Sequence, residues 1–383
     1  MALHFTTSEL AGRRQAALKA TPDEGLDGLL MFRQESMFYL TGYDSFRFVF
    51  FQCLYLGSDG ALTLLTRAPD LLQAQHTSVI SDIRIWVDRP DATPAENLRA
   101  ILDEHRCRGQ RLGIELEAYG LTGRSLRMVD AALDGFCDLV DAPELISRLR
   151  VIKSPAELAY VERAAELADA ALTEARENAE PGADESDILA AMQGAVFRGG
   201  GDYAGNEFII GSGKDALLCR HFSGRRRPDL DDQLTLEFAG VYRRYHACLI
   251  RTICIGRIPD RQRDMWHACH EASLASMHAL KPGFPIGQVF DAHARVLDHA
   301  GFQDHRLNAC GYSLGALHHP NWMDWPMLYA GNPELAAPNM VFFLHMILAD
   351  SDTGLAMTLG QTVRVTESGC EPLSRAPLEL VEK

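Results

Sequence analysis

The chain has 383 residues, of which 47% are hydrophobic and 23% are charged, an ordinary composition for a folded protein of two or three domains. Its formal charge of −15 argues against general nucleic-acid binding, which usually needs a basic face. The nine cysteines are scattered without a Cys-x-x-Cys pair, and no apolar run is long enough to span a membrane. We therefore expect a cytoplasmic protein with reduced thiols that binds neither membranes nor nucleic acid.

The first 150 residues alternate helix and strand signals. Ser8 is a candidate cap for an opening helix that runs to Lys19, and an amphipathic helix is expected over 95–105. Short apolar or β-branched runs predict strands at 28–32, 48–57, 61–66, 83–87 and 111–116. This alternation predicts a smaller α/β domain over residues 1–150.

The remainder, residues 151–383, begins with a strong helix signal. Ser154 can cap the helix, Pro155 suits its first position and Glu157 completes a capping box. A second helix is expected over 185–197, and two more near 261–280 and 286–300. Strand patterns lie between and after these helices, at 207–211, 232–241, 245–256, 340–348 and 361–366. Helix pairs that alternate with antiparallel hairpins predict an α+β domain.

A predicted hairpin within 237–252 carries the first candidate site residues. Alternation places Glu237 and Cys248 on one face of the sheet. With the turn centred between Tyr242 and Arg243, these two residues would lie directly opposite each other, with Cβ atoms about 5 Å apart. That geometry suits two ligands of one metal ion, but the hairpin by itself favours the simpler explanation of a half-exposed glutamate beside a core cysteine.

A wider series of motifs resembles the creatinase/aminopeptidase P/prolidase family, which has the pita-bread fold. The motifs, in chain order, are SPAELAYVERA, HFSG, EFAGVYRRYHACLIRT, GYSLG, MVFFLHMIL and TVRVTESG. Metal-dependent members of that family hold two ions with two aspartates, a histidine and two glutamates. The corresponding places in this sequence are Glu237, Cys248, Tyr312, His345 and Gly360. The resemblance therefore implies that the dinuclear site is lost and that no cofactor is needed, with a zinc site of Glu237, Cys248 and His345 as the alternative.

The resemblance also implies what chemistry remains. In creatinase a histidine transfers protons during metal-free C–N hydrolysis, and that place is His221 here, with His319 at a second active-site histidine. The hairpin and the GYSLG turn are most similar to the ectoine hydrolase branch, which opens a cyclic amidine. We therefore expect a hydrolase that cleaves a C–N bond of a small cyclic amidine or amide, with Glu237 holding the amidinium and orienting water.

Other residues are expected to bind this small-molecule substrate. Tyr312, His345, Cys248 and Trp322 are candidates within the catalytic domain, and Arg243 and Arg244 are either solvated turn residues or a contact for a carboxylate or a subunit. In creatinase-like homodimers the partner subunit closes the site, and the candidates for that role are Phe46 and Arg47. The alternative functions are a metal-dependent Xaa-Pro dipeptidase or aminopeptidase and a catalytically inactive binding protein.

Overall fold

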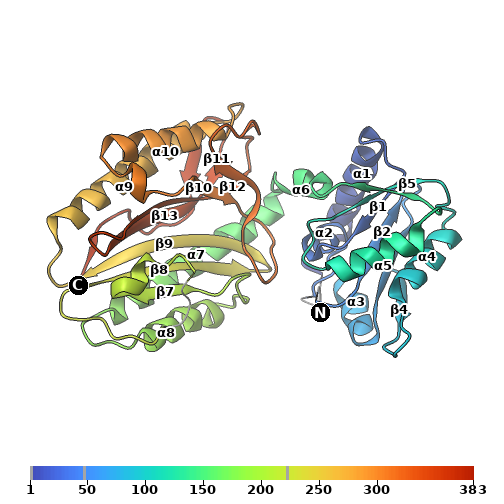
Figure 1. Cartoon of the computed structure of the whole chain (residues 1–383), viewed down its shortest axis with the longest axis horizontal. Helices are drawn as coiled ribbons and strands as arrows, with labels where there is room; N and C mark the ends of the chain where they lie inside the picture. Colours follow the sequence, from blue (N-terminus) through green and yellow to red (C-terminus); the bar gives the residue numbers. More distant parts are fainter. Residues whose placement is uncertain (1–2, 46–48, 221–223) are drawn as a thin grey trace. The chain divides into compact units, whose positions relative to one another are not determined.

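The computed structural model of the chain describes residues 3–45, 49–220 and 224–383 (Figure 1). The chain divides into two compact units, Met1–Arg150 and Val151–Lys383, which are described separately below. Helices and strands alternate in both units, so the predicted α+β class is confirmed. None of the described helices is both long and apolar enough to cross a membrane.

The first unit is built around a six-stranded mixed sheet. Its strand order is β4-β3-β2-β1-β5-β6, in which β2 runs antiparallel to β1 and β3 while the other neighbours are parallel. The strands are β1 (Gly28–Met31), β2 (Cys53–Gly57), β3 (Leu62–Arg67), β4 (Asp82–Trp86), β5 (Arg111–Ile114) and β6 (Asp138–Asp141).

Helices α1 to α6 belong to this unit, together with the short 3-10 turn η1 (Ala68–Asp70). The cap expected at Ser8 is wrong, because Thr6 precedes the helix and its Oγ1 accepts a hydrogen bond of 3.2 Å from the Glu9 amide. The helices are α1 (Thr7–Asp23), α2 (Gln34–Thr41), α3 (Leu71–Thr77), α4 (Pro94–Glu104), α5 (Gly123–Leu133) and α6 (Leu145–Arg150).

The second unit contains a nine-stranded sheet with the order β11-β10-β12-β13-β9-β8-β7; β14 pairs with β13, and β15 pairs with β9. All neighbours are antiparallel except β15, which runs parallel to β9. The strands are β7 (Ile209–Ser212), β8 (Asp232–Tyr242), β9 (Tyr245–Ile255), β10 (Ala309–Ser313), β11 (Asp324–Tyr329), β12 (Val341–Asp350), β13 (Leu355–Val365), β14 (Cys370–Pro372) and β15 (Val381–Glu382).

Four long helices accompany this sheet. The capping box predicted for the first is confirmed: Ser154 Oγ accepts from the Glu157 amide at 3.3 Å, and Glu157 Oε2 accepts from the Ser154 amide at 2.8 Å. The helices are α7 (Pro155–Asn178), α8 (Glu185–Arg198), α9 (Asp260–Ala279) and α10 (Gly287–His299), with 3-10 turns η2 (Gly213–Leu217) and η3 (Gln303–His305).

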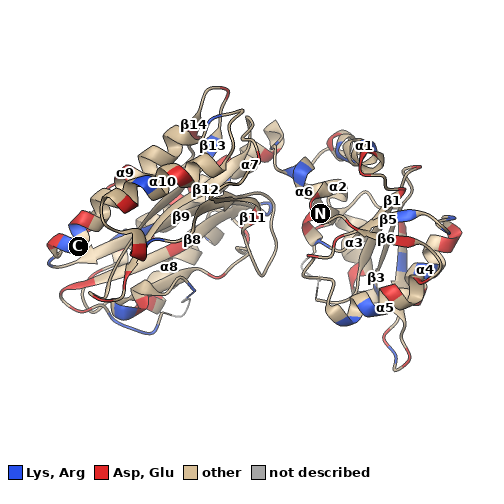
Figure 2. Ribbon diagram, turned by 45° about the horizontal axis from the view of Figure 1, so that its top comes forward, with Lys and Arg blue, Asp and Glu red and all other residues tan. Residues whose placement is uncertain are grey.

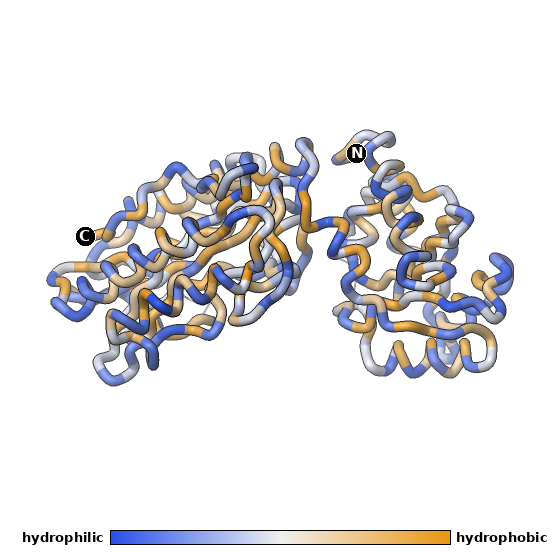
Figure 3. Tube along the Cα trace, turned by 90° about the horizontal axis from the view of Figure 1, so that it is seen from above, coloured by the Kyte–Doolittle hydropathy of each residue, from blue (hydrophilic) through white to orange (hydrophobic). Residues whose placement is uncertain are grey.

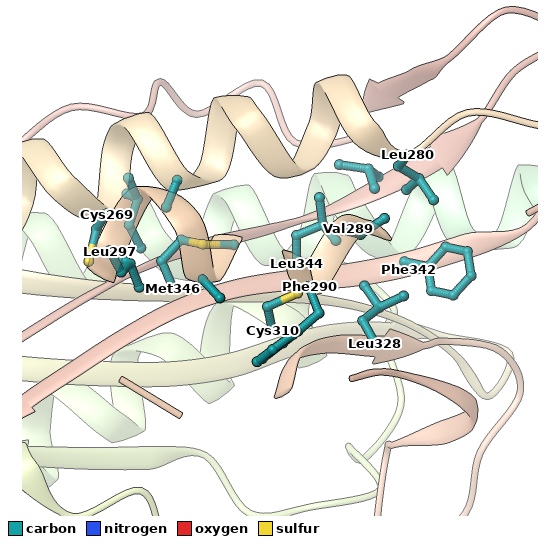
Figure 4. Packing of buried hydrophobic residues seen from close by; sticks show 14 of the residues in the cluster. Cys269, Leu280, Val289, Phe290, Leu297, Cys310, Leu328, Phe342, Leu344 and Met346 are labelled. Carbon is teal, nitrogen blue, oxygen red and sulfur yellow. The ribbon is translucent and has the colours of Figure 1, made fainter. Parts of the chain in front are cut away.

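The helices cover one face of the sheet and leave the other for a site. Helix α7 packs on β8 and β9, and α9 packs on β12 and β13 (Figure 1). Leu344 and Met346 of β12 point to α9 and α10, where they join a large apolar cluster with Cys269 and Leu297 (Figure 4). Figure 3 shows hydrophobic stretches running through the middle of this unit, while hydrophobic and hydrophilic residues alternate along its outer turns. Side chains alternate along a strand, so the odd-numbered His345 lies on the opposite face.

The β8–β9 hairpin has a different register from the predicted one. Arg243 and Arg244 form a two-residue turn with positive φ angles of 49° and 71°, the combination that a type I′ turn requires. Tyr242 therefore pairs with Tyr245, and Glu237 lies opposite Ile250 instead of Cys248. The predicted pairing was wrong by two residues. Because the error is even, Glu237 and Cys248 still share a face and are diagonal neighbours.

We predict that Gly240→Ala destabilises the second unit by at least about 2 kcal/mol. A Cβ atom at this position would lie 1.9 Å from the carbonyl oxygen of Ala164 in α7, so the helix would have to move off the sheet. Urea unfolding measures the loss. The control is Gly194→Ala in α8, where only the end of the Arg198 side chain is close and alanine should instead stabilise by roughly 0.5–1 kcal/mol. Equal stability of wild type and Gly240→Ala would contradict the packing.

Candidate active site

The candidate site lies on the helix-free face, where the five motif positions meet across the sheet. Glu237 pairs with Ile250, Ile250 with Gly360, and Gly360 with His345, so four strands contribute one continuous row. The next row toward the hairpin turn contains Cys248 opposite Ala239, and Phe343 between Thr362 and Tyr312. Segments more than 100 residues apart in sequence are thus brought to one surface by strand register alone.

A chain of hydrogen bonds connects three of the predicted site residues. Trp322 Nε1 donates to the Tyr312 hydroxyl at 2.8 Å, and this hydroxyl donates to Glu237 Oε1 at 3.3 Å. All three side chains are buried. Since a hydroxyl has one proton to give, the indole fixes its direction by occupying an acceptor position. We call Trp322, Tyr312 and Glu237 the site relay.

Burial raises the pKa of Glu237 to about 7, because the charged form loses its hydration inside the protein. The positive charge of Arg220 and the hydrogen bond from Tyr312 act in the opposite direction and limit the rise. Cys219 and Cys248 also face this carboxyl, since its negative charge raises the pKa of both thiols further. A carboxyl that titrates near neutrality can accept and return a proton at working pH.

The other polar groups of the site stay neutral. Burial lowers the pKa of His345 to about 3, helped by the neighbouring His293, so its imidazole carries no charge at neutral pH. The ring lies 5.6 Å from that of Tyr312, centroid to centroid. Burial, followed by the charge of Glu237, raises the pKa of the Cys248 thiol well above its ordinary value. Glu237 is therefore the one residue of these three that changes charge near neutral pH.

The donor set does not fit the two metal ions that the family resemblance would bring. Gly360 offers no side chain, and a Cβ there would lie 2.4 Å from the Leu344 carbonyl oxygen and 2.8 Å from Ile250 Cγ2. The Tyr312 hydroxyl is engaged in the relay. Within the described parts of the chain, no three His, Cys, Asp or Glu side chains are grouped closely enough to hold a metal ion. Glu237, Cys248 and His345, the three residues of the alternative zinc site, are therefore not grouped as a metal site in the described structure.

Several predicted site residues lie elsewhere or outside the described residues. His319 is exposed, and its Nε2 is 3.2 Å from Glu207 Oε1, so its ionic partner is Glu207 rather than Glu237. His221, Phe46 and Arg47 lie outside the described residues. The catalytic roles of His221 and His319, and the closing role of Phe46 and Arg47, stay predictions.

Two neighbours of Glu237 were missed by the sequence reasoning. Arg220 is close enough for its charge to lower the pKa of the carboxyl, and Cys219 lines a small cavity together with Glu237, Thr235 and Thr358. Both residues directly precede His221 in the motif LLCRHFSG, so the motif could have pointed to them.

Two family matches together extend over most of the chain. Residues 159–367 match metallopeptidase family M24, and residues 13–152 match the creatinase/prolidase N-terminal domain. The first match alone covers more than half of the sequence. The chain therefore belongs to metallopeptidase family M24, as the motif series predicts.

The relatives include an ectoine hydrolase and several Xaa-Pro dipeptidases. Ectoine hydrolase from Halomonas elongata is 29% identical over 403 residues, which cover 100% of this chain and 99% of that protein. Xaa-Pro dipeptidase from Pyrococcus furiosus is 24% identical over 238 residues, covering 62% of this chain and 67% of that enzyme. Among solved structures, a prolidase from Thermococcus sibiricus superimposes with a TM-score of 0.88 at 19% identity, over 99% of this chain and 100% of its own. That likeness confirms the predicted pita-bread fold.

We predict that Glu237 makes the folded protein less stable as pH rises. Its folded pKa of about 7 lies above its ordinary value of 4.5, so folding is favoured by the bound proton. This contribution to stability is complete below the ordinary pKa of 4.5 and is lost as the pH rises through the folded pKa of about 7. Between about pH 5 and pH 8, wild type should therefore lose on the order of 3 kcal/mol relative to Glu237→Gln.

Urea unfolding at a series of pH values measures this difference. The control is Glu177→Gln, a substitution at an exposed position of α7, which should run parallel to wild type throughout. If wild type and Glu237→Gln also ran parallel, the carboxyl would not titrate near neutrality.

Proposed function

We propose that this chain is a hydrolase that opens a C–N bond of a small cyclic amidine or amide without a metal ion, with ectoine or a relative of ectoine as substrate. The observation that carries the proposal is the buried carboxyl of Glu237, which has a pKa of about 7 and is held by Tyr312. It stands where metal-dependent relatives would need a hard oxygen ligand. The positions around it have become Cys248, Gly360 and His345, which leave that carboxyl to act on the substrate directly.

The two oxygens of Glu237 have separate tasks in this proposal. Oε1 accepts from Tyr312, whereas Oε2 has no hydrogen-bond partner among the described residues and can turn to the substrate. As a carboxylate, Glu237 binds the amidinium through a charge-assisted hydrogen bond, which is about twice as strong as a neutral one. The relay holds the carboxyl in one orientation, so little reorganisation is required when the substrate binds.

The reaction is an addition of water followed by loss of nitrogen. The water oxygen, oriented by Glu237, bonds to the amidine carbon and transfers a proton to a base. The tetrahedral intermediate then breaks its C–N bond, and the leaving nitrogen takes up a proton. We assign these proton transfers to His221 together with Glu237, because the pKa of Glu237 is about 7 and histidine is the side chain whose reference pKa lies close to neutral pH. Trp322, Tyr312 and neutral His345 would line the space for the substrate ring.

The ectoine hydrolase, which matches this chain from end to end, supports this proposal. Peptidase relatives also match the chain, so the choice between the two rests on the residues of the site. A metal-dependent peptidase would also require ligands that Gly360 and Ile250 exclude. We further propose a homodimer in which Phe46 and Arg47 complete the partner's site. A pure binding protein does not need to keep a buried carboxyl at the position of Glu237, which argues against the second rival.

We predict turnover of a cyclic amidine that survives treatment with a chelator. Purified protein is incubated with ectoine, hydroxyectoine, creatine or Gly-Pro, and products are identified by mass spectrometry. The expected result is a mass gain of one water on a cyclic substrate, with and without EDTA. Cleavage of Gly-Pro that is lost with EDTA and restored by Mn²⁺ would establish the peptidase instead. No turnover of any of the four, by folded protein, would favour the binding protein.

Three substitutions separate the roles within the site. His221→Ala should lower kcat by about 10²- to 10⁴-fold with little change in KM, as expected for loss of acid–base help. Glu237→Gln should lower kcat and also raise KM, because it removes the charge that binds the amidinium. Cys248→Ser should change kcat by less than about tenfold, since the thiol stays protonated. Damage from Cys248→Ser with full activity of His221→Ala would instead indicate thiolate or metal chemistry.

A further inference from the structure

The two halves of the candidate site meet where β9 pairs with β13. This pairing is much shorter than the other pairings between long strands of the sheet. β8 and β9 pair over eleven residues and β12 and β13 over ten, but β9 and β13 pair over three: Leu249, Ile250 and Arg251 with Gln361, Gly360 and Leu359. We call this junction, with residues 248–252 and 358–362, the central seam. Glu237 lies on one side of it and Tyr312 on the other, so their hydrogen bond depends on its width.

Side chains replace backbone hydrogen bonds at both ends of the central seam. The Thr362 hydroxyl accepts from the Cys248 amide at 2.7 Å and donates to the Cys248 carbonyl at 3.0 Å. At the other end, the Thr252 hydroxyl accepts from the Thr358 amide at 2.9 Å. Strands bridged in this way stand farther apart than strands in a regular ladder, and the bridging side chains then set the separation.

Arg251 bridges the middle of the seam from the face that the helices cover. Its Nη1 donates to the Ile250 carbonyl at 2.9 Å and to the Gly360 carbonyl at 2.5 Å. These are the two central members of the row that runs from Glu237 to His345. The guanidinium is 1% exposed, so the hydrogen bonds are shielded from water.

Stability alone does not explain a charged residue at this position. Among the residues that the structure describes, Nε and Nη2 of Arg251 have no hydrogen-bond partner, and no carboxylate forms an ion pair with it. Burial lowers its pKa to about 10, which reflects the cost of keeping the charge in the interior. The nearest acidic groups are engaged elsewhere: Asp169 accepts from Ser374 and the Arg375 amide, and Glu379 pairs with Arg176.

We propose that Arg251 is a positioning residue, which holds the central seam at the width at which the Tyr312 hydroxyl reaches Glu237. Its two carbonyl contacts tie the Glu237 half of the site to the Gly360 half across the row itself. A methionine would fill the same space and relieve the buried charge, but it could not bridge the two carbonyls. The proposal concerns the geometry of the site. It rests on the proposed function only in that this geometry would serve the proposed hydrolysis.

The test compares wild type with Arg251→Lys and Arg251→Met and requires no substrate. Hydrogen–deuterium exchange should be about fivefold or more faster in peptides that cover the central seam, because a bridging hydrogen bond is lost. Acrylamide should also quench Trp322 fluorescence more strongly, because the relay opens. Subtracting the signal of Trp322→Phe in each background isolates this tryptophan from the other three. Arg251→Lys keeps the charge, so an equal effect in both variants assigns it to the bridge.

The control is Arg226→Met, which removes an arginine that binds Ser212 and Asp232 at the β7 edge of the same sheet. It should lower the melting temperature while leaving seam exchange and Trp322 quenching at wild-type values. If both Arg251 variants also leave these two readouts unchanged, Arg251 is a structural residue only and the proposal is wrong. If Arg251→Met does not fold, Arg251→Lys decides. Neither readout involves turnover. A negative result would therefore contradict the positioning role of Arg251 without contradicting the proposed hydrolysis, and absence of turnover would not contradict the positioning role.

Discussion

The hydrogen bond between Tyr312 and Glu237 is the contact on which the candidate site depends. It joins a strand of one hairpin to a strand on the far side of the sheet, and among the described residues it is the one side-chain hydrogen bond to the buried Glu237 carboxyl. Without it, burial would push the carboxyl further toward the neutral form. The bond requires correct register across β8, β9, β13, β12 and β10, so the fold and the ionisation of one residue are tied together.

The surroundings of this contact explain why the residue can stay near its midpoint. Charged side chains are mostly on helices and loops, and the central strands are nearly free of them (Figure 2). Desolvation is the largest influence on the pKa of a carboxyl in such surroundings, and Arg220 and Tyr312 act against it. A nearby lysine would lower the pKa of this carboxyl strongly, and a second carboxylate would raise it strongly. The apolar packing on the helix face therefore contributes to the chemistry by keeping other charges away.

The fold class and the main elements of the second unit could be predicted because their signals are local. Ser154 and Glu157 specify a helix start by their spacing, and alternation correctly placed Glu237 and Cys248 on one face. The hairpin register could not be predicted from alternation, since shifts by two residues preserve the faces. It is decided by backbone dihedrals at Arg243 and Arg244, which are not residues that usually mark a type I′ turn.

The relay could be predicted only in part, because its members meet through long-range pairing. Tyr312 and Trp322 were chosen from the motifs that contain them, but nothing local indicates that the indole binds the hydroxyl. Arg220 illustrates the same limit, since its effect on Glu237 is a matter of distance in space. Periodicity shows which face a residue occupies, whereas contacts between strands far apart in sequence require the folded sheet.

Gly360 has a consequence for how this chain could change in evolution. The family resemblance assigns a metal ligand to this place, but here the Leu344 carbonyl and the Ile250 side chain occupy the volume that any side chain would enter. A single mutation that introduced a glutamate would therefore collide with its neighbours before it could bind an ion. Ile250 would have to become smaller first, a step that gives no benefit by itself. Each neighbour that fills the space beside Gly360 therefore increases the number of simultaneous changes that a metal-binding side chain at this position would require.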